Sequence, residues 1–278
     1  MFEKLIALIT ECSKYDFFAA TNKLNDFISR SEHFFKLISQ IGTIPESIAH
    51  DSTEEKLFAK ASDAILSRAF RELGLKSTVL SERGDAADVM AQSRIYDYTL
   101  VADAKAFRLS RTAKNQKDFK ITALSNWRKD NDYAVLCSPY FQYPQSQSQI
   151  FAQAIDNNFC LLSWEHLIFL LAHGIKENKS VNLSTLWNFS ESFSHNVVVA
   201  EKEKCFIRIF DTHLLSTVGQ TQTEFDKTLA VCVRNITQRG QTEITYWEDE
   251  RNTIAAYTRE EAVSELIKCK KIDKKSNK

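Results

Sequence analysis

The chain has 278 residues, of which 44% are apolar, with 36 basic and 36 acidic side chains. This apolar fraction is enough to bury a large core, which excludes a disordered chain, and the low content of Gly and Pro excludes a collagenous or Pro-rich one. Because the net charge is zero, only the distribution of charge along the sequence can indicate partners.

The terminal and cysteine patterns indicate a cytoplasmic protein. The six cysteines form no C-x-x-C pair, so we interpret them as reduced thiols. The N-terminus begins with charged residues ahead of a short amphipathic run, which is not a signal peptide. The longest dense apolar stretch, residues 166–172, is far shorter than a bilayer span, so no membrane association is expected.

The apolar spacing predicts an α/β core with additional helices at both ends. Residues 1–50 are expected to be mainly helical, and the clearest helix spans 52–73, which begins at competent N-cap residues and ends at Gly74. The following elements are strands at 87–92, 98–107, 132–139 and 158–164, and helices at 117–129, 146–156 and 164–173. This order predicts a mixed β-sheet flanked by helices, followed by a helical region that ends in a basic tail.

Charged residues on two successive strands form the strongest chemical pattern. Asp103 and Lys105 point to the same face because side chains alternate along a strand. Asp88 begins the preceding strand, and an antiparallel hairpin can bring it beside Asp103. Two adjacent carboxylates repel each other unless a cation lies between them, and oxygen ligands of this kind suit Mg²⁺. A neighbouring lysine can orient a water or neutralise phosphoryl charge, so the pattern favours metal-assisted phosphodiester hydrolysis. A plain salt bridge between Asp103 and Lys105 is the alternative.

Six basic residues recur at every third position after the second of these strands, with one acidic residue among them. This spacing is typical of phosphate contacts, and the intervening Asn115 and Gln116 can bond bases, whereas a solvated helix face normally mixes both signs. The basic residues are Lys105, Arg108, Arg111, Lys114, Lys117 and Lys120.

Other candidate residues have weaker support. Glu55, in the first turn of the 52–73 helix, is a candidate accessory carboxylate or a residue that interacts with the helix dipole. Glu82 and Asp118 are further acidic residues near the motif. His166 and His173 share one helix face without a third ligand, so we interpret them as structural. Without a glycine-rich phosphate loop, an NTPase is not expected.

Long segments of the chain resemble the HindIII family of type II restriction endonucleases. The main one is LVADAKAFRLSRTAKNQKDFKITALSNWRKDNDYAVL at 100–136, and shorter ones are STEEKLFAKASD at 52–63, ERGDAADV at 82–89, YFQYP at 140–144, SQIF at 148–151, SWEHL at 163–167 and TREEAVSELIK at 258–268. The resemblance is close over 43–190, patchy before it and poor over 190–257. It implies one domain over 1–278, with N-terminal helices (1–50), a PD-(D/E)xK nuclease core (51–175) and a mainly helical extension (176–278).

The resemblance also implies an activity. The expected enzyme is a homodimer that uses one or two Mg²⁺ ions per active site, or Mn²⁺ instead, and cleaves both strands of DNA at a six-base palindrome. The expected site is AAGCTT, cut after the first A to leave 5′-phosphates. A cognate methyltransferase is expected to protect the same site in the host.

Carried over by position, the resemblance assigns several roles. Asp88 matches the first motif aspartate, although Ala87 replaces the proline that names the motif. Asp103 and Lys105 match the D-x-K element, and the carbonyl of Ala104 is implied as a further metal ligand. The base-reading segment is matched by Asn115 and Lys117, and acidic positions near the site are matched by Glu82 and Asp118.

Two alternatives from other functional classes remain. One is a DNA-binding protein on a nuclease fold without catalysis, against which the intact acidic and lysine pattern speaks. The other is a structure-selective nuclease, such as a junction resolvase or repair enzyme. The amide side chains among the basic residues favour sequence reading, because shape selection depends more on charge.

Overall fold

The structure is a computed structural model. It describes residues 1–80, 87–111, 119, 121–144, 148–196, 205–270 and 272. The chain divides into two compact units, Met1–Val233 and Arg234–Lys278. The single domain expected from the resemblance stays a prediction.

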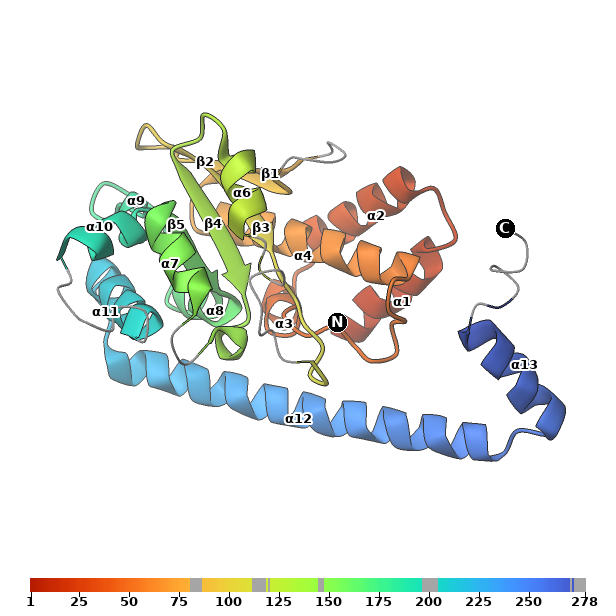
Figure 1. Ribbon diagram of the computed structural model, residues 1–278. Coiled ribbons are helices and arrows are strands. Elements are labelled where there is room, and N and C mark those ends of the chain that lie inside the picture. Colours follow the sequence, from red (N-terminus) through yellow and green to blue (C-terminus); the bar gives the residue numbers. More distant parts are fainter. Residues whose placement is uncertain are drawn as a thin grey trace. The chain divides into compact units, whose positions relative to one another are not determined.

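In the described part of the chain, a mixed sheet of five strands lies at the centre of the first unit (Figure 1). The strands follow chain order across the sheet, and the first three run antiparallel while the last three run parallel. Their bounds are β1 Lys76–Val79, β2 Val89–Gln92, β3 Thr99–Ala104, β4 Tyr133–Ser138 and β5 Phe159–Ser163. The predicted α/β class with a mixed sheet is therefore confirmed.

Helices cover the two faces of this sheet. Helix α4 (Thr53–Glu72) lies against β1, β2 and β3 and contacts α8 (Trp164–Ala172), whereas α6 (Ile121–Arg128) and α7 (Gln149–Asp156) contact each other over β3, β4 and β5. The Ser52 side chain accepts a hydrogen bond from the N–H of Glu55, which caps α4 as its sequence predicts.

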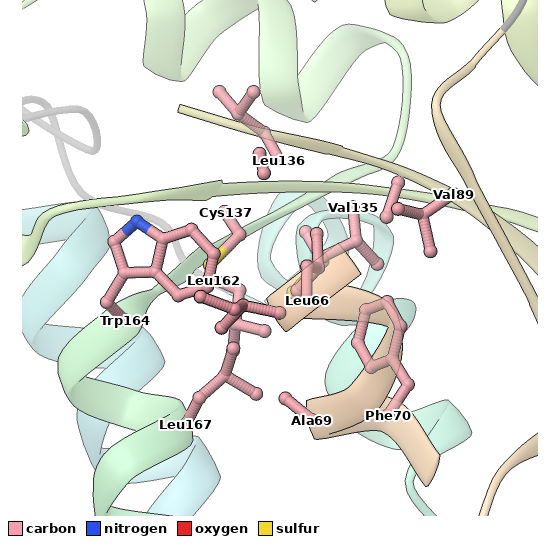
Figure 2. Packing of buried hydrophobic residues seen from close by; sticks show 14 of the residues in the cluster. Leu66, Ala69, Phe70, Val89, Val135, Leu136, Cys137, Leu162, Trp164 and Leu167 are labelled. Carbon is pink, nitrogen blue, oxygen red and sulfur yellow. The ribbon is translucent and has the colours of Figure 1, made fainter. Parts of the chain in front are cut away.

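The core between α4 and the sheet is largely apolar. Figure 2 shows Leu66 and Phe70 of α4 on the same side of the sheet as Val135, with Leu136 on the opposite side. All four side chains are fully buried. This alternation fixes the register of β4 and, through pairing, the register of the neighbouring β3.

The remaining helices come before and after the core. The N-terminal ones are α1 Phe2–Cys12, α2 Phe17–Arg30 and α3 Phe34–Ile38. The single-turn η1 (Tyr140–Gln142) follows β4. The C-terminal ones are α9 Ser184–Trp187, α10 Phe189–Asn196, α11 Phe206–Val218, α12 Gln222–Ala255 and α13 Arg259–Cys269. The helical character expected after residue 185 is thus confirmed.

Two sequence predictions differ from the structure. The predicted strand 98–107 ends at Ala104, because the N–H of Phe107 donates to the carbonyl of Gly42 instead of continuing the ladder. Strand β1 was not assigned from the sequence because its four residues, KSTV, are mostly polar. Pairing with β2 and packing against α4 hold it in the sheet.

None of the described helices combines the length and apolar composition needed to cross a bilayer. The six cysteines all lie in described parts of the chain, and none forms a disulfide, as expected.

Candidate active site

The β2–β3 hairpin brings the two predicted carboxylates together. Val89 pairs with Ala102 in the antiparallel ladder, so Asp88 and Asp103 are the next opposed residues. A ligand oxygen of each lies within 4.8 Å of the other and of Asp63. The predicted proximity of Asp88 and Asp103 is therefore observed.

Asp63 is the carboxylate that sequence reasoning missed. It lies in the middle of α4, and its side chain is only 4% exposed. The available signal was its position among small and apolar residues, Ala61, Ser62 and Ala64, since an aspartate almost never lies buried without partners. From this helix the sequence analysis named only Glu55, two turns earlier, as a candidate accessory carboxylate or a residue that interacts with the helix dipole.

Lys105 follows β3 and contacts the cluster directly. Its Nζ lies 2.5 Å from Oδ2 of Asp103, so the two side chains lie on one face as predicted and also form the salt bridge named as the alternative. Its backbone is held on both sides, because its N–H donates to the carbonyl of Cys137 at 2.7 Å and its carbonyl accepts from Nε1 of Trp164 at 2.9 Å. These two hydrogen bonds fix the backbone of Lys105 and therefore the position of its Cβ.

A glycine allows Trp164 to reach this position. A Cβ on Gly42 would lie 2.9 Å from Cδ1 of Trp164, which is too close, and 3.1 Å from Cγ of Pro139, which is tight. The loop after Lys105 is then bonded to the same segment, since the carbonyl of Phe107 accepts from the N–H of Ile44 at 3.1 Å.

A second lysine, Lys60, comes from α4. Its Nζ contacts Oδ1 of Asp88 and lies 3.6 Å from Oδ2 of Asp63. Sequence reasoning missed it too, because the contact depends on how α4 packs against β2. Among the described residues, the cluster therefore contains three carboxylates and two ammonium groups.

Burial and repulsion dominate the electrostatics of the cluster. Burial raises the pKa of Asp63 well above its usual range, and the charges of Asp88 and Asp103 raise it further, while Lys60 and Lys105 oppose these effects. For Lys60, burial lowers the pKa, but the nearby Asp63 and Asp88 more than compensate, so its pKa lies above the ordinary value.

This donor set suits a divalent cation. Three carboxylates held close together on two strands and one helix are hard oxygen ligands, which Mg²⁺ prefers. Burial and the neighbouring carboxylates together raise the pKa of Asp63, and a cation between the oxygens would relieve the repulsion among them. Ala104, the predicted carbonyl ligand, is the buried last residue of β3.

Glu55 belongs to a different cluster, with His50 and Asp51. One carboxylate oxygen accepts from the N–H of Asp51 at 2.8 Å and lies 3.3 Å from Nδ1 of His50. The other lies 2.7 Å from Nη2 of Arg108. Burial raises the pKa of Glu55, but the hydrogen bonds and charge of Arg108 outweigh it, so the net pKa is lowered.

Arg108, predicted to contact DNA, is held by the protein in this structure. Besides its bond to Glu55, its Nη1 donates to the carbonyl of Pro45 at 2.9 Å. Ser110 is bonded to Glu46 through its hydroxyl at 2.6 Å. Arg111, the next predicted contact, is exposed. The segment that leaves the active site is thus attached to residues 42–55.

Several predicted residues lie outside the described part of the chain. These are Glu82, Lys114, Asn115, Lys117, Asp118 and Lys120. Their roles stay predictions.

His166 has protein partners that account for its burial. Its Nδ1 lies within hydrogen-bond distance of Ser163, and its Nε2 lies 2.7 Å from Oδ1 of Asp211. These contacts agree with the structural role predicted from the sequence.

Comparison with known proteins identifies the family. The family model described as HindIII restriction endonuclease matches residues 3–277. The chain belongs to the HindIII restriction endonuclease family. A curated member, the type II restriction enzyme HindIII of Haemophilus influenzae, is 45% identical over 269 residues, which cover 96% of this chain and 89% of the relative.

Membership in the HindIII family confirms the resemblance found in the sequence and the predicted enzyme class, a restriction endonuclease. The family match also includes residues 190–257, where the sequence motifs were poor.

Proposed function

We propose that the chain is a Mg²⁺-dependent type II restriction endonuclease that cleaves both strands of DNA at AAGCTT, after the first A, and leaves 5′-phosphates. The observation that carries this proposal is the convergence of Asp63, Asp88 and Asp103 beside Lys105 in a chain of the HindIII family. The relative's printed name supports the sequence specificity by analogy.

Asp88 and Asp103 would hold the metal, together with the carbonyl of Ala104 and with Asp63 as a third carboxylate. One or two Mg²⁺ ions held here would stabilise the negative charge that develops on the phosphate oxygens and would lower the pKa of a water, and Mn²⁺ is expected to substitute. Lys105 then presents a fixed positive charge where the phosphate oxygens gain charge. Its backbone bonds to Cys137 and Trp164 reduce the freedom of this group.

DNA contacts are proposed for the basic segment that follows Lys105. Arg111, Lys114 and Lys120 suit phosphates, and Asn115 and Lys117 suit base edges. Arg108 was also predicted to contact phosphate, but its bonds to Glu55 and Pro45 support an anchoring role instead.

The proposed partners follow from the palindrome. Cutting both strands of a symmetric site suits a homodimer with one active site per strand. A cognate methyltransferase would protect the same sequence in the host, and both proteins would act in the cytoplasm.

Digestion of a plasmid of known sequence, with and without Mg²⁺, tests this function. We expect discrete fragments whose ends map to AAGCTT, and no cutting with EDTA. Retention of DNA without cutting would favour a non-catalytic binding protein. Cutting limited to junctions or flaps would favour a structure-selective nuclease.

A further inference from the structure

Helix α4 places a cation inside the carboxylate cluster. Lys60 and Asp63 lie three residues apart on this helix, so their side chains share one face. The ammonium group of Lys60 contacts Asp88 on one side and Asp63 on the other. Lys60 thereby links helix α4 to Asp88, the residue directly before strand β2.

The two lysines divide the three carboxylates between them. Lys105 is paired with Asp103, and Lys60 lies with Asp88 and Asp63. Their charges offset part of the repulsion among carboxylates that lie within 4.8 Å of one another. The two lysines therefore help the cluster to remain folded before a metal binds.

A divalent cation would bind the same carboxylates. Lys60 contacts the carboxylate of Asp88, which a metal bound with Asp63 and Asp103 would also use, so an ammonium and a metal ion would compete for one negatively charged group. The Lys60 side chain is 24% exposed, so its flexible stem can move toward solvent when a cation takes its place. Lys105 is less exposed, and two hydrogen bonds hold its backbone. We therefore expect Lys105 to keep its place beside Asp103 when a metal binds.

We propose that Lys60 is a built-in competitor of the metal: its ammonium occupies the carboxylates of Asp63 and Asp88 in the metal-free chain and sets the metal concentration that the site requires. This inference rests on the proposed metal site and adds a role that the nuclease motif does not contain. Lys60 is a positioning residue, because it acts through the carboxylates and not on the DNA.

Calorimetric titration with Ca²⁺ tests the role of Lys60 without turnover. We expect Lys60→Met to bind Ca²⁺ about tenfold or more tightly than the unmodified chain, because one competing charge is gone. Lys60→Arg keeps the charge and should bind with nearly unchanged affinity. Lys56→Met is the matched control, since it removes a charge from the exposed preceding turn of α4 and should change little.

Thermal unfolding with and without Ca²⁺ gives a second readout in case Lys60→Met is destabilised. Without the ion this variant should melt earlier than the unmodified chain, because the buried carboxylates repel each other. Saturating Ca²⁺ should raise its melting temperature by more than it raises that of the unmodified chain.

The outcomes separate this inference from the proposed function. Equal Ca²⁺ affinities for the unmodified chain and Lys60→Met, or weaker binding by the variant, would overturn competition by Lys60 and leave the metal site standing. If neither protein binds Ca²⁺, the metal site and the role of Lys60 are both contradicted.

Discussion

The described residues include two clusters rich in acidic side chains, which differ in the origin and burial of their members. Asp63, Asp88 and Asp103 come from one helix and two strands, and the side chains of Asp63 and Asp103 are only 4% exposed. His50, Asp51 and Glu55 come from one short segment at the start of α4, where the side chains of His50 and Asp51 are 67% and 81% exposed.

The difference shows what turns carboxylates into a candidate catalytic centre. In the exposed cluster, solvent screens the charges, and Glu55 is satisfied by Arg108 and a backbone N–H. In the buried cluster, burial and the charges of Asp88 and Asp103 raise the pKa of Asp63, and Lys60 and Lys105 oppose this effect. Only the second arrangement has a strong reason to bind a metal.

The largest expected effect is on the cleavage rate, and it should follow substitutions in the buried cluster but not in the exposed one. Asp103→Asn or Asp88→Asn should lower the single-turnover cleavage rate by about 10³-fold or more, because a metal ligand is lost. DNA binding in Ca²⁺ should survive, since removing negative charge near a phosphate also relieves repulsion. Glu55→Gln is the control from the exposed cluster and should cleave at a rate far closer to that of the unmodified chain. A variant at Asp103 that cleaves normally with Mg²⁺ would show that the buried cluster is not the active site.

Substitution of Lys105 should have the next largest effect on the cleavage rate. Lys105→Ala is expected to lower the cleavage rate by about 10²-fold, the size of effect seen when one fixed electrostatic donor is removed. Rate and affinity are measured separately, by single-turnover cleavage with Mg²⁺ and by DNA titration in Ca²⁺. If the main defect is in affinity, Lys105 holds the DNA and does not assist the chemistry.

The ion pair of Arg108 with Glu55 links the exposed cluster to the segment that leaves the active site. Removing either partner, in Arg108→Met or Glu55→Gln, should lower the free energy of unfolding by about 1–3 kcal/mol, because the other is left partly buried without its charge partner. The double variant should lose less than the sum of the single ones.

The salt dependence of DNA binding distinguishes an anchor from a phosphate contact. If Arg108 is an anchor, Arg108→Met and Glu55→Gln should leave the slope of affinity against salt unchanged. If Arg108 binds phosphate, Arg108→Met alone should reduce that slope by about one unit. Arg111→Met provides the comparison, since the exposed Arg111 is proposed to contact phosphate.

The smallest effect is expected at His50. Its ring is largely exposed, and its contacts to Asp51 and Glu55 are both 3.3 Å long. His50→Ala should therefore change the free energy of unfolding by less than about 1 kcal/mol and leave cleavage intact. A large loss of cleavage in this variant would place the exposed cluster in the catalytic machinery.

The sequence predicted the parts of the site that depend on local order. Alternation along β3 set Asp103 and Lys105 on one face, and the short hairpin brought Asp88 beside them. Asp63 and Lys60 were missed because their contacts depend on the packing of a helix on a sheet, which no local spacing encodes. Glu55 was a candidate accessory carboxylate because of its position at the start of α4, but in the structure its side chain pairs with Arg108.

Electron paramagnetic resonance titration with Mn²⁺ tests the central claim most directly, because it counts bound ions without DNA or turnover. The unmodified chain and Glu55→Gln should both bind Mn²⁺, whereas the double variant Asp88→Asn, Asp103→Asn should lose this binding. Retained binding in the double variant together with lost binding in Glu55→Gln would place the metal in the exposed cluster and contradict the account.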